Sequence, residues 1–221
     1  MRIVIVGAGL AGTNLARALS EAGHAVTLVD HNAEIASRGF VEYGLASIVG
    51  DGTDPRVLRE ADVGHADVVA AMLRRDADNL AVAAIARDEG AKRILARLRD
   101  PAYRGIYARG GIDQVFGEID TMVGALSVAI EHPRVRHSMV VGSGDSIAFE
   151  IMVPETAANA GKTVRDVGMH PNFPRGAVIA GIAGPDGEVV VPRGDAIIRA
   201  GDVVLLVAHG RDIESAIDFF T

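Results

Sequence analysis

The chain has 221 residues, of which 49% are hydrophobic and 23% charged, a balance typical of a globular protein and not of a disordered or fibrous one. Its formal net charge is −7 and its Lys and Arg residues never cluster beyond a pair, which argues against binding to nucleic acid. Because no apolar stretch approaches the ~18 residues of a membrane-spanning helix and cysteine is absent, we expect a cytoplasmic protein that does not span the membrane and has no disulfides.

Strand and helix patterns alternate over residues 1–117. A β-branched run at residues 2–6 leads into a helical pattern that ends at Gly23. Further strands are expected at Ala25–Asp30, Ala46–Val49, Val68–Met72, Arg93–Arg97 and Gln114–Phe116, with helices between them. This alternation with short connections predicts an α/β fold with a doubly wound parallel sheet.

The stretch that follows predicts a helix that is hydrophobic over most of its circumference. One apolar stripe consists of Ile119, Val123, Leu126 and Ile130, and the opposite flank of Met122, Ala125, Val128 and Ala129. Such a helix must be covered on several sides. We expect a connecting helix that also packs against a second subunit; the alternative is a helix buried in its own domain.

Beyond Pro133 the pattern changes to short strands and turns. Strands are expected at Ala148–Val153, Ala177–Ala183, Val189–Val191 and Val203–Val207, and Pro185–Glu188 has the composition of a turn. These features predict a second, small α+β domain. With the boundary placed within His132–Val141, the domains are residues 1–132, including the connecting helix, and 133–221.

A glycine motif, Gly7-Ala8-Gly9-Leu10-Ala11-Gly12, directly follows the first strand and opens the first helix. In a Rossmann-like domain, Gly7 permits the tight turn, Gly9 the approach of a pyrophosphate and Gly12 the helix–strand contact. The phosphate lies at the positive end of the helix, at Leu10 and Ala11. The alternative is that the glycines serve packing alone.

An acidic residue, Asp30, ends the second predicted strand. A carboxylate at this place accepts hydrogen bonds from a ribose diol. The next residue is His31, which we also expect at the cofactor, and not an arginine, so the sequence favours NAD(H) or an adenosine nucleotide over NADP. The alternative is a surface aspartate.

Polar residues also follow the third and fourth strands, at the edge of the sheet where open α/β folds bind ligands. Asp51, Gly52 and Thr53 follow the third strand, and we expect them on the adenine side of a nucleotide. Asp76 and Asn79 follow the fourth strand. The alternatives are a turn with a helix cap for the first group and helix capping for the second.

Catalytic groups are not evident beside this predicted site. The seven histidines are scattered, and none pairs with a carboxylate at a catalytic spacing or forms a metal-binding pattern. A nucleotide-binding site without groups to use the nucleotide chemically indicates sensing. We therefore predict a protein that is not an enzyme and holds no metal.

Several stretches, taken together, resemble the RCK domains that regulate potassium conductance. The resemblance to the N-terminal RCK domain rests on Gly7–Gly12, Asp30, Gly50–Pro55, Asp76–Leu80 and Ile94–Pro101. The resemblance to the C-terminal RCK domain rests on Gly161–Val167, Gly187–Asp195 and Gly201–Val203. The chain thus resembles a Trk/Ktr-type, TrkA-like potassium-uptake regulatory subunit with one copy of the two-domain unit.

The resemblance implies a peripheral homo-oligomer, as a dimer, tetramer or octameric ring, on the cytoplasmic side of a membrane potassium-translocating subunit. NAD(H), ADP or ATP would occupy the glycine loop, and their exchange would gate the pore. The implied contacts are Gly7, Gly9 and Gly12 for phosphate, Asp30 for ribose, Asp51 and Thr53 for adenine, and Asp76, Asn79 and Arg97 for the phosphate or nicotinamide side. For Arg97 the alternative is an ordinary charge at a strand end.

The sequence also departs from the family pattern. Ala8 stands where Ktr-type members often have a phosphate-binding arginine, and residues 71–79 lack the threonine and first glutamate of T-x-x-D-E-x-N. That stretch instead has Arg74 and Arg75, either of which is a candidate phosphate contact. Glu118 lies roughly where some Ktr-type members have a carboxylate that binds a cation at the dimer interface. Here we expect it to be an acidic residue at the start of a helix, where the helix dipole favours it.

The predicted function is therefore nucleotide-sensing regulation of potassium uptake through ligand-dependent ring conformations. One alternative is an NAD-dependent oxidoreductase with its substrate domain at residues 134–221. The other is an RCK regulatory subunit of a different cation transporter or antiporter.

Overall fold

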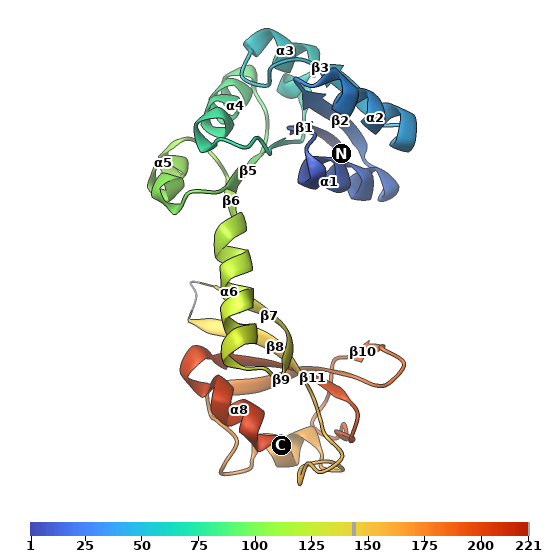
Figure 1. The fold of residues 1–221 in the computed structure, drawn as a ribbon, viewed down its shortest axis with the longest axis vertical. Coiled ribbons are helices and arrows are strands. Elements are labelled where there is room, and N and C mark those ends of the chain that lie inside the picture. The colour runs from blue at the N-terminus through green and yellow to red at the C-terminus, as the bar shows by residue number, and fades with distance from the viewer. Residues whose placement is uncertain (143–144, 221) are drawn as a thin grey trace. The chain divides into compact units, whose positions relative to one another are not determined.

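A computed structural model describes residues 1–142 and 145–220 of the chain (Figure 1). Its contacts divide the chain into two compact units, Met1–Ile119 and Asp120–Thr221. The division lies before the predicted boundary because helix α6, Glu118–Glu131, buries Val128 in the core of the second unit. Among the residues described, no helix combines the length and hydrophobicity required to cross a bilayer.

The first unit contains a six-stranded, fully parallel sheet in the order β3-β2-β1-β4-β5-β6. Its strands are β1 (Arg2–Val6), β2 (Ala25–Asp30), β3 (Ala46–Val49), β4 (Val68–Ala71), β5 (Ile94–Leu98) and β6 (Gln114–Gly117). The predicted doubly wound, Rossmann-like sheet is confirmed. Because the strand order reverses between β1 and β4, the carboxyl ends of these two strands flank the crevice where such folds bind ligands.

Helices cover both faces of this sheet (Figure 1). They are α1 (Leu10–Glu21), α2 (Ala33–Tyr43), α3 (Pro55–Glu60), α4 (Asp76–Glu89) and α5 (Arg104–Arg109), with short 3-10 turns η1 (Val63–His65) and η2 (Pro101–Tyr103). Alternate residues of β1 enter two cores: Ile3 and Ile5 lie in the core that includes α1, whereas Val4 and Val6 lie in the core that includes α3 and α4. Burial on both faces explains the continuous apolar run of this strand.

The second unit contains a five-stranded antiparallel sheet in the order β10-β9-β11-β8-β7. Its strands are β7 (Val135–Val141), β8 (Ser146–Met152), β9 (Ala177–Ala183), β10 (Val189–Val190) and β11 (Val203–His209), with helices α7 (Val164–Gly168) and α8 (Ile213–Phe219) and the turn η3 (Gly210–Asp212). Phe149, Leu206 and Phe220 are among its fully buried side chains. The predicted α+β class is confirmed.

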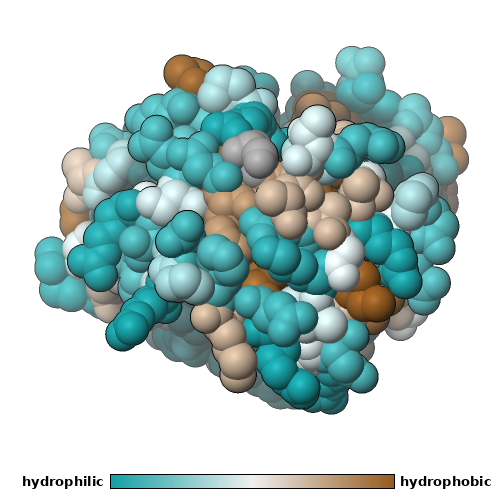
Figure 2. Space-filling view, turned by 90° about the horizontal axis from the view of Figure 1, so that it is seen from below, coloured by the Kyte–Doolittle hydropathy of each residue, from teal (hydrophilic) through white to brown (hydrophobic). Residues whose placement is uncertain are grey.

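The outer surface of the second unit has two apolar features. Figure 2 views this unit from below and shows hydrophilic residues over most of that face, with hydrophobic residues gathered near its centre. On α6, the residues Val123, Leu126 and Ile130 are 49%, 53% and 76% exposed. The apolar stripe of α6 is therefore not buried in its own domain, whereas Val128 on the other flank is.

Candidate functional site

The glycine motif forms the loop between β1 and α1, and two of its glycines are required by packing. Gly7 has a φ of +107°, and a Cβ atom there would lie 2.9 Å from the carbonyl carbon and oxygen of Met72. A Cβ atom on Gly12 would overlap the carbonyl oxygen of Gly7. Gly9 differs, because its φ is −61° and a Cβ atom there would meet nothing within 4 Å. Packing thus explains Gly7 and Gly12 but leaves open space beside Gly9.

The N-terminus of α1 is not neutralised by an acidic side chain of the same helix. Gly9 is its N-cap and provides no side-chain acceptor, and the first turn contains no Asp or Glu. In the part of the chain that the structure describes, no side chain accepts a hydrogen bond from the amide groups of Leu10 or Ala11. Free amide donors and the helix dipole make such an end favourable for an anion.

Asp30 joins the end of β2 to the glycine loop. Its side chain is buried, Oδ2 accepts a hydrogen bond from the Ala8 amide at 2.7 Å, and Oδ1 accepts one from the Asn32 amide at 2.9 Å. His31 Nδ1 lies 3.3 Å from Oδ1, and its ring is exposed. Each carboxylate oxygen has a further lone pair, so the group retains capacity to accept hydrogen bonds from a ribose.

The loop after β3 is built around Asp51, Gly52 and Thr53. Asp51 Oδ1 accepts hydrogen bonds from the Thr53 amide at 2.9 Å and the Thr53 hydroxyl at 2.8 Å, and these bonds lower the pKa of the Asp51 carboxyl. A Cβ atom on Gly52 would overlap the side chain of Val6, so only glycine lets this loop approach β1. Asp51 and Thr53 therefore form the turn that the alternative interpretation described, while Asp51 stays exposed beside the sheet edge.

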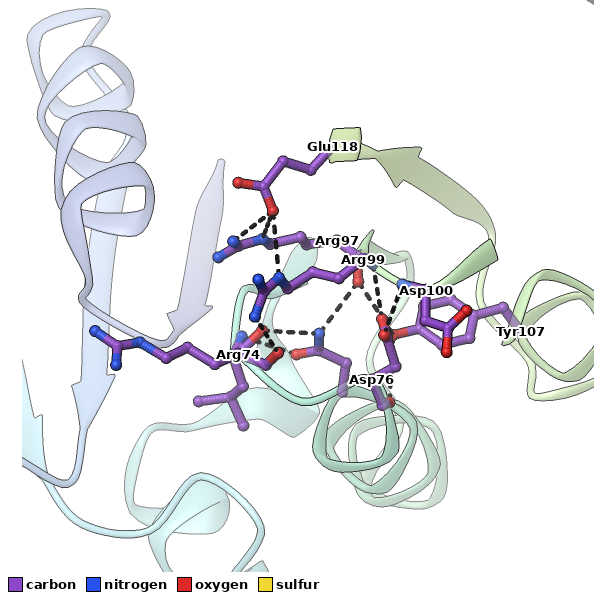
Figure 3. Close-up of polar contacts among 9 residues, drawn as sticks. Arg74, Asp76, Arg97, Arg99, Asp100, Tyr107 and Glu118 are labelled. Carbon is purple, nitrogen blue, oxygen red and sulfur yellow. Dashed lines mark hydrogen bonds and ion pairs between the residues drawn. The ribbon is translucent and has the colours of Figure 1, made fainter. Parts of the chain in front are cut away.

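Asn79 and Asp76, from the first turn of α4, are engaged inside the protein, and Figure 3 shows the contacts of Asp76. The fully buried Asn79 accepts a hydrogen bond from the Leu73 amide at 2.8 Å and donates to the carbonyl oxygens of Leu73 and Arg97, each at 3.1 Å. Neither side chain caps α4, whose N-cap, Arg75, makes no side-chain cap hydrogen bond. Asn79 instead ties the end of β4 to that of β5.

Asp76 anchors the chain segment after β5. Its carboxylate accepts hydrogen bonds from the Arg99 amide at 2.9 Å, the Asp100 amide at 3.0 Å and the Tyr107 hydroxyl at 3.0 Å. Burial and the bond to Asp76 raise the pKa of Tyr107 far above its usual value, so the hydroxyl keeps the proton that it donates. Direct contact of Asp76 or Asn79 with a nucleotide stays a prediction, because both act here on the protein itself.

Tyr107 is a residue of this site that sequence reasoning missed. It is fully buried, although it lies on the short helix α5, and its partner Asp76 is 31 residues away. No motif or spacing in the sequence links the two residues.

Arg97, predicted on the phosphate or nicotinamide side, forms an ion pair. Its Nε lies 2.7 Å from Oε2 of Glu118, the first residue of α6, and Arg99 Nε lies 3.8 Å from the same oxygen (Figure 3). Glu118, which follows β6, thus contacts two arginines at the end of β5. Within the described residues, no group of three or more acidic or histidine side chains is arranged to hold a metal ion.

Besides Asp51, Gly52 and Thr53 in the loop after β3, the structure brings the predicted residues to the same edge of the sheet in two groups. The glycine loop and Asp30 lie together at the ends of β1 and β2, as the hydrogen bond from the Ala8 amide shows. Asp76, Asn79 and Arg97 lie together at the ends of β4 and β5. The groups adjoin across the crevice, since the Met72 amide donates to the carbonyl oxygen of Val6 at 2.8 Å.

Known proteins resemble this chain over its whole length. Residues 3–118 match the TrkA-N domain and residues 148–221 the TrkA-C domain. The Trk system potassium uptake protein TrkA homolog of Methanothermobacter thermautotrophicus is 29% identical over 100% of both chains. The homolog of Archaeoglobus fulgidus is 32% identical over 97% of this chain, which spans only 48% of that relative.

Among solved structures, the GsuK channel bound to NAD covers 100% of this chain with a TM-score of 0.68 and 21% sequence identity. This chain corresponds to 39% of that one. At this identity the likeness shows a shared fold.

Proposed function

The chain belongs to the TrkA family, and on that premise we propose that it serves a potassium-uptake system as a nucleotide-sensing regulatory subunit. The observation that supports a nucleotide site most directly is the open space beside Gly9, at the head of α1 and next to the buried carboxylate of Asp30. The nucleotide is bound as a signal and not as a substrate. NAD(H), ADP and ATP are the proposed ligands, and the NAD-bound solved relative supports the first of them.

Regulation follows if the subunit has two conformations of similar free energy. A ligand shifts their populations only when it contacts the two states differently. The glycine loop and Asp30 would hold the adenosine half of every ligand, while the groups at the ends of β4 and β5 would meet the half that differs. Exchange of one nucleotide for another then changes the state that the membrane subunit encounters.

The exposed stripe of α6 supports assembly with further copies of this chain. Val123, Leu126 and Ile130 present an apolar row to solvent that a second copy would cover. Such a homo-oligomer would lie peripherally at the cytoplasmic face of the membrane and bind a potassium-translocating subunit. The alternative is that the protein regulates a different cation transporter or antiporter. A pull-down with candidate membrane subunits, repeated with each nucleotide, would show which subunit the protein retains and so distinguish the two.

The experiment that tests the nucleotide site is calorimetric titration of the nucleotide-stripped protein with NADH, NAD, ADP and ATP, with light scattering to count subunits. We expect saturable binding that differs among the nucleotides and an oligomer whose assembly depends on the ligand. Absence of binding would refute the proposal. Turnover of NADH with added carbonyl compounds would instead establish the oxidoreductase alternative.

Replacing Asp30 with alanine is expected to weaken binding of every nucleotide about tenfold or more, because a hydrogen bond to a charged group contributes roughly 1.5–3 kcal/mol. The matched control is Asp67→Ala. Asp67 also accepts a backbone amide hydrogen bond, from Arg2 at 2.8 Å, but it precedes β4 at the opposite edge of the sheet. Equal affinities of the Asp30 and Asp67 variants in the same titration would exclude the ribose assignment.

A further inference from the structure

We propose that Arg74 binds the distal phosphate of the nucleotide and thereby makes the site prefer adenosine polyphosphates to NAD, an inference that rests on the nucleotide site proposed above. Arg74 lies in the loop between β4 and α4, on the other side of the crevice from Asp30. This loop runs along the glycine loop, since a Cβ atom on Gly7 would lie 3.1 Å from the Leu73 amide nitrogen. The next residue along the chain is Arg74.

Arg74 differs from the other arginines at this edge in having an unengaged side chain. Arg97 and Arg99 contact Glu118, and Arg75 lies 3.7 Å from Asp78. The Arg74 side chain is exposed and makes no hydrogen bond or ion pair with any residue that the structure describes. In Figure 3 its guanidinium points away from Asp76 and Glu118, toward the pale blue ribbon of the N-terminal strand and helix.

The backbone that presents Arg74 is held in place. Its carbonyl oxygen accepts a hydrogen bond from Arg99 Nη1 at 3.4 Å, and the preceding residue, Leu73, is bound through both backbone groups to Asn79. The loop is therefore positioned by the protein while the guanidinium remains available. A fixed backbone lowers the entropic cost of a contact that this side chain makes with a ligand.

Charge balance at the glycine loop indicates what this guanidinium would bind. The glycine motif contains no basic residue, and α1 offers only its amide groups and about half an elementary charge of helix dipole. A bound ADP or ATP places several negative charges near these groups. Arginine presents a planar fork of donors that matches phosphate oxygens, so Arg74 would supply the missing cation.

The position of Arg74 across the crevice determines which nucleotide gains affinity from it. With the ribose at Asp30 on the β2 side and the first phosphates at α1, the far end of the ligand reaches the β4 side. In ATP and ADP that end is a free phosphate, whereas in NAD it is the nicotinamide riboside. Arg74 therefore adds affinity for the former and little for the latter.

The test is calorimetric titration of the full chain and its Arg74→Gln variant with ATP, ADP, AMP and NAD. We expect the variant to lose about ten- to hundredfold in affinity for ATP, less for ADP, and under about threefold for AMP and NAD. Arg74→Lys should restore part of the ATP affinity, because the charge remains while the fork is lost. Thermal unfolding of the exposed variant should match that of the parent.

Arg75→Gln is the matched control, since it removes an adjacent exposed arginine whose partner is Asp78. Equal losses for Arg74→Gln and Arg75→Gln, or equal losses for ATP and NAD, would overturn the inference in favour of a general basic surface. Unchanged ATP affinity in Arg74→Gln alongside tight binding by the parent would overturn this inference alone. Failure of the parent to bind any nucleotide would refute the proposed function as well.

Discussion

Gly12→Ala is expected to abolish nucleotide binding. It should also lower the free energy of unfolding by about 3 kcal/mol, because the added methyl group overpacks the contact between α1 and β1. Its Cβ atom would overlap the Gly7 carbonyl oxygen and lie 3.6 Å from the Ile5 side chain. Both neighbours belong to β1 or the tight turn that follows it. Relief of the clash requires α1 to move away from β1, which displaces the amide groups that would hold phosphate.

Gly9→Ala is the matched variant that separates binding from folding. Position 9 has a backbone conformation that any residue adopts and open space for a Cβ atom, so its free energy of unfolding should stay within about 1 kcal/mol of the parent. Binding should fall at least about tenfold, because the added methyl group occupies the approach of the phosphate. Denaturant unfolding and calorimetry of both variants provide the two readouts. Unchanged affinity in Gly9→Ala would show that no ligand approaches this backbone.

The first unit was predictable because its inner strands β1, β2, β4 and β5 are short apolar runs, largely buried on both faces and separated by helical patterns. Local signals also mark its helices: Asp54 is the N-cap of α3 and accepts a hydrogen bond from the Arg56 amide at 2.8 Å, and Pro55 is the first helical residue. The elements of the second unit that were not predicted include β7 and α8. β7 is an edge strand with mostly exposed side chains, so its sequence lacks a buried apolar pattern. α8 is short, and its three buried residues pack on a core formed by distant strands.

In the candidate site, too, local features could be predicted from the sequence, whereas contacts between residues far apart in the sequence could not. That the glycine motif and Asp30 lie together could be predicted, because both belong to one local strand–turn–helix–strand arrangement. The part played by Asp76 was not predicted, since spacing suggested a cap or a ligand. Its partners Arg99, Asp100 and Tyr107 lie 23, 24 and 31 residues away and meet it only through the pairing of β4 with β5.

Asp76→Ala is expected to lower the free energy of unfolding by about 3–4 kcal/mol, because each buried donor left without an acceptor costs roughly 1–3 kcal/mol and water relieves part of the loss. The donors left without an acceptor are the amides of Arg99 and Asp100, whereas the Tyr107 hydroxyl loses the carboxylate but keeps the carbonyl oxygens of Asp76 and Arg97 at 3.3 and 3.1 Å. Asp78→Ala is the control from the same helical turn. Its weak, partly exposed pairing with Arg75 should contribute less than about 1 kcal/mol.

Tyr107→Phe and the double variant test whether Asp76 stabilises the protein through this network. Tyr107→Phe should cost about 1 kcal/mol alone and less in the Asp76→Ala background, since the carboxylate acceptor of the hydroxyl is already absent there. Denaturant unfolding of the four proteins gives the coupling energy, and strictly additive effects would contradict the network. Asp76 also fixes the start of the helix that follows Arg74, so the Asp76 variant should lose ATP affinity through the displaced loop. Loss of ATP and NAD affinity with unchanged stability would instead identify Asp76 as a direct ligand of the nucleotide.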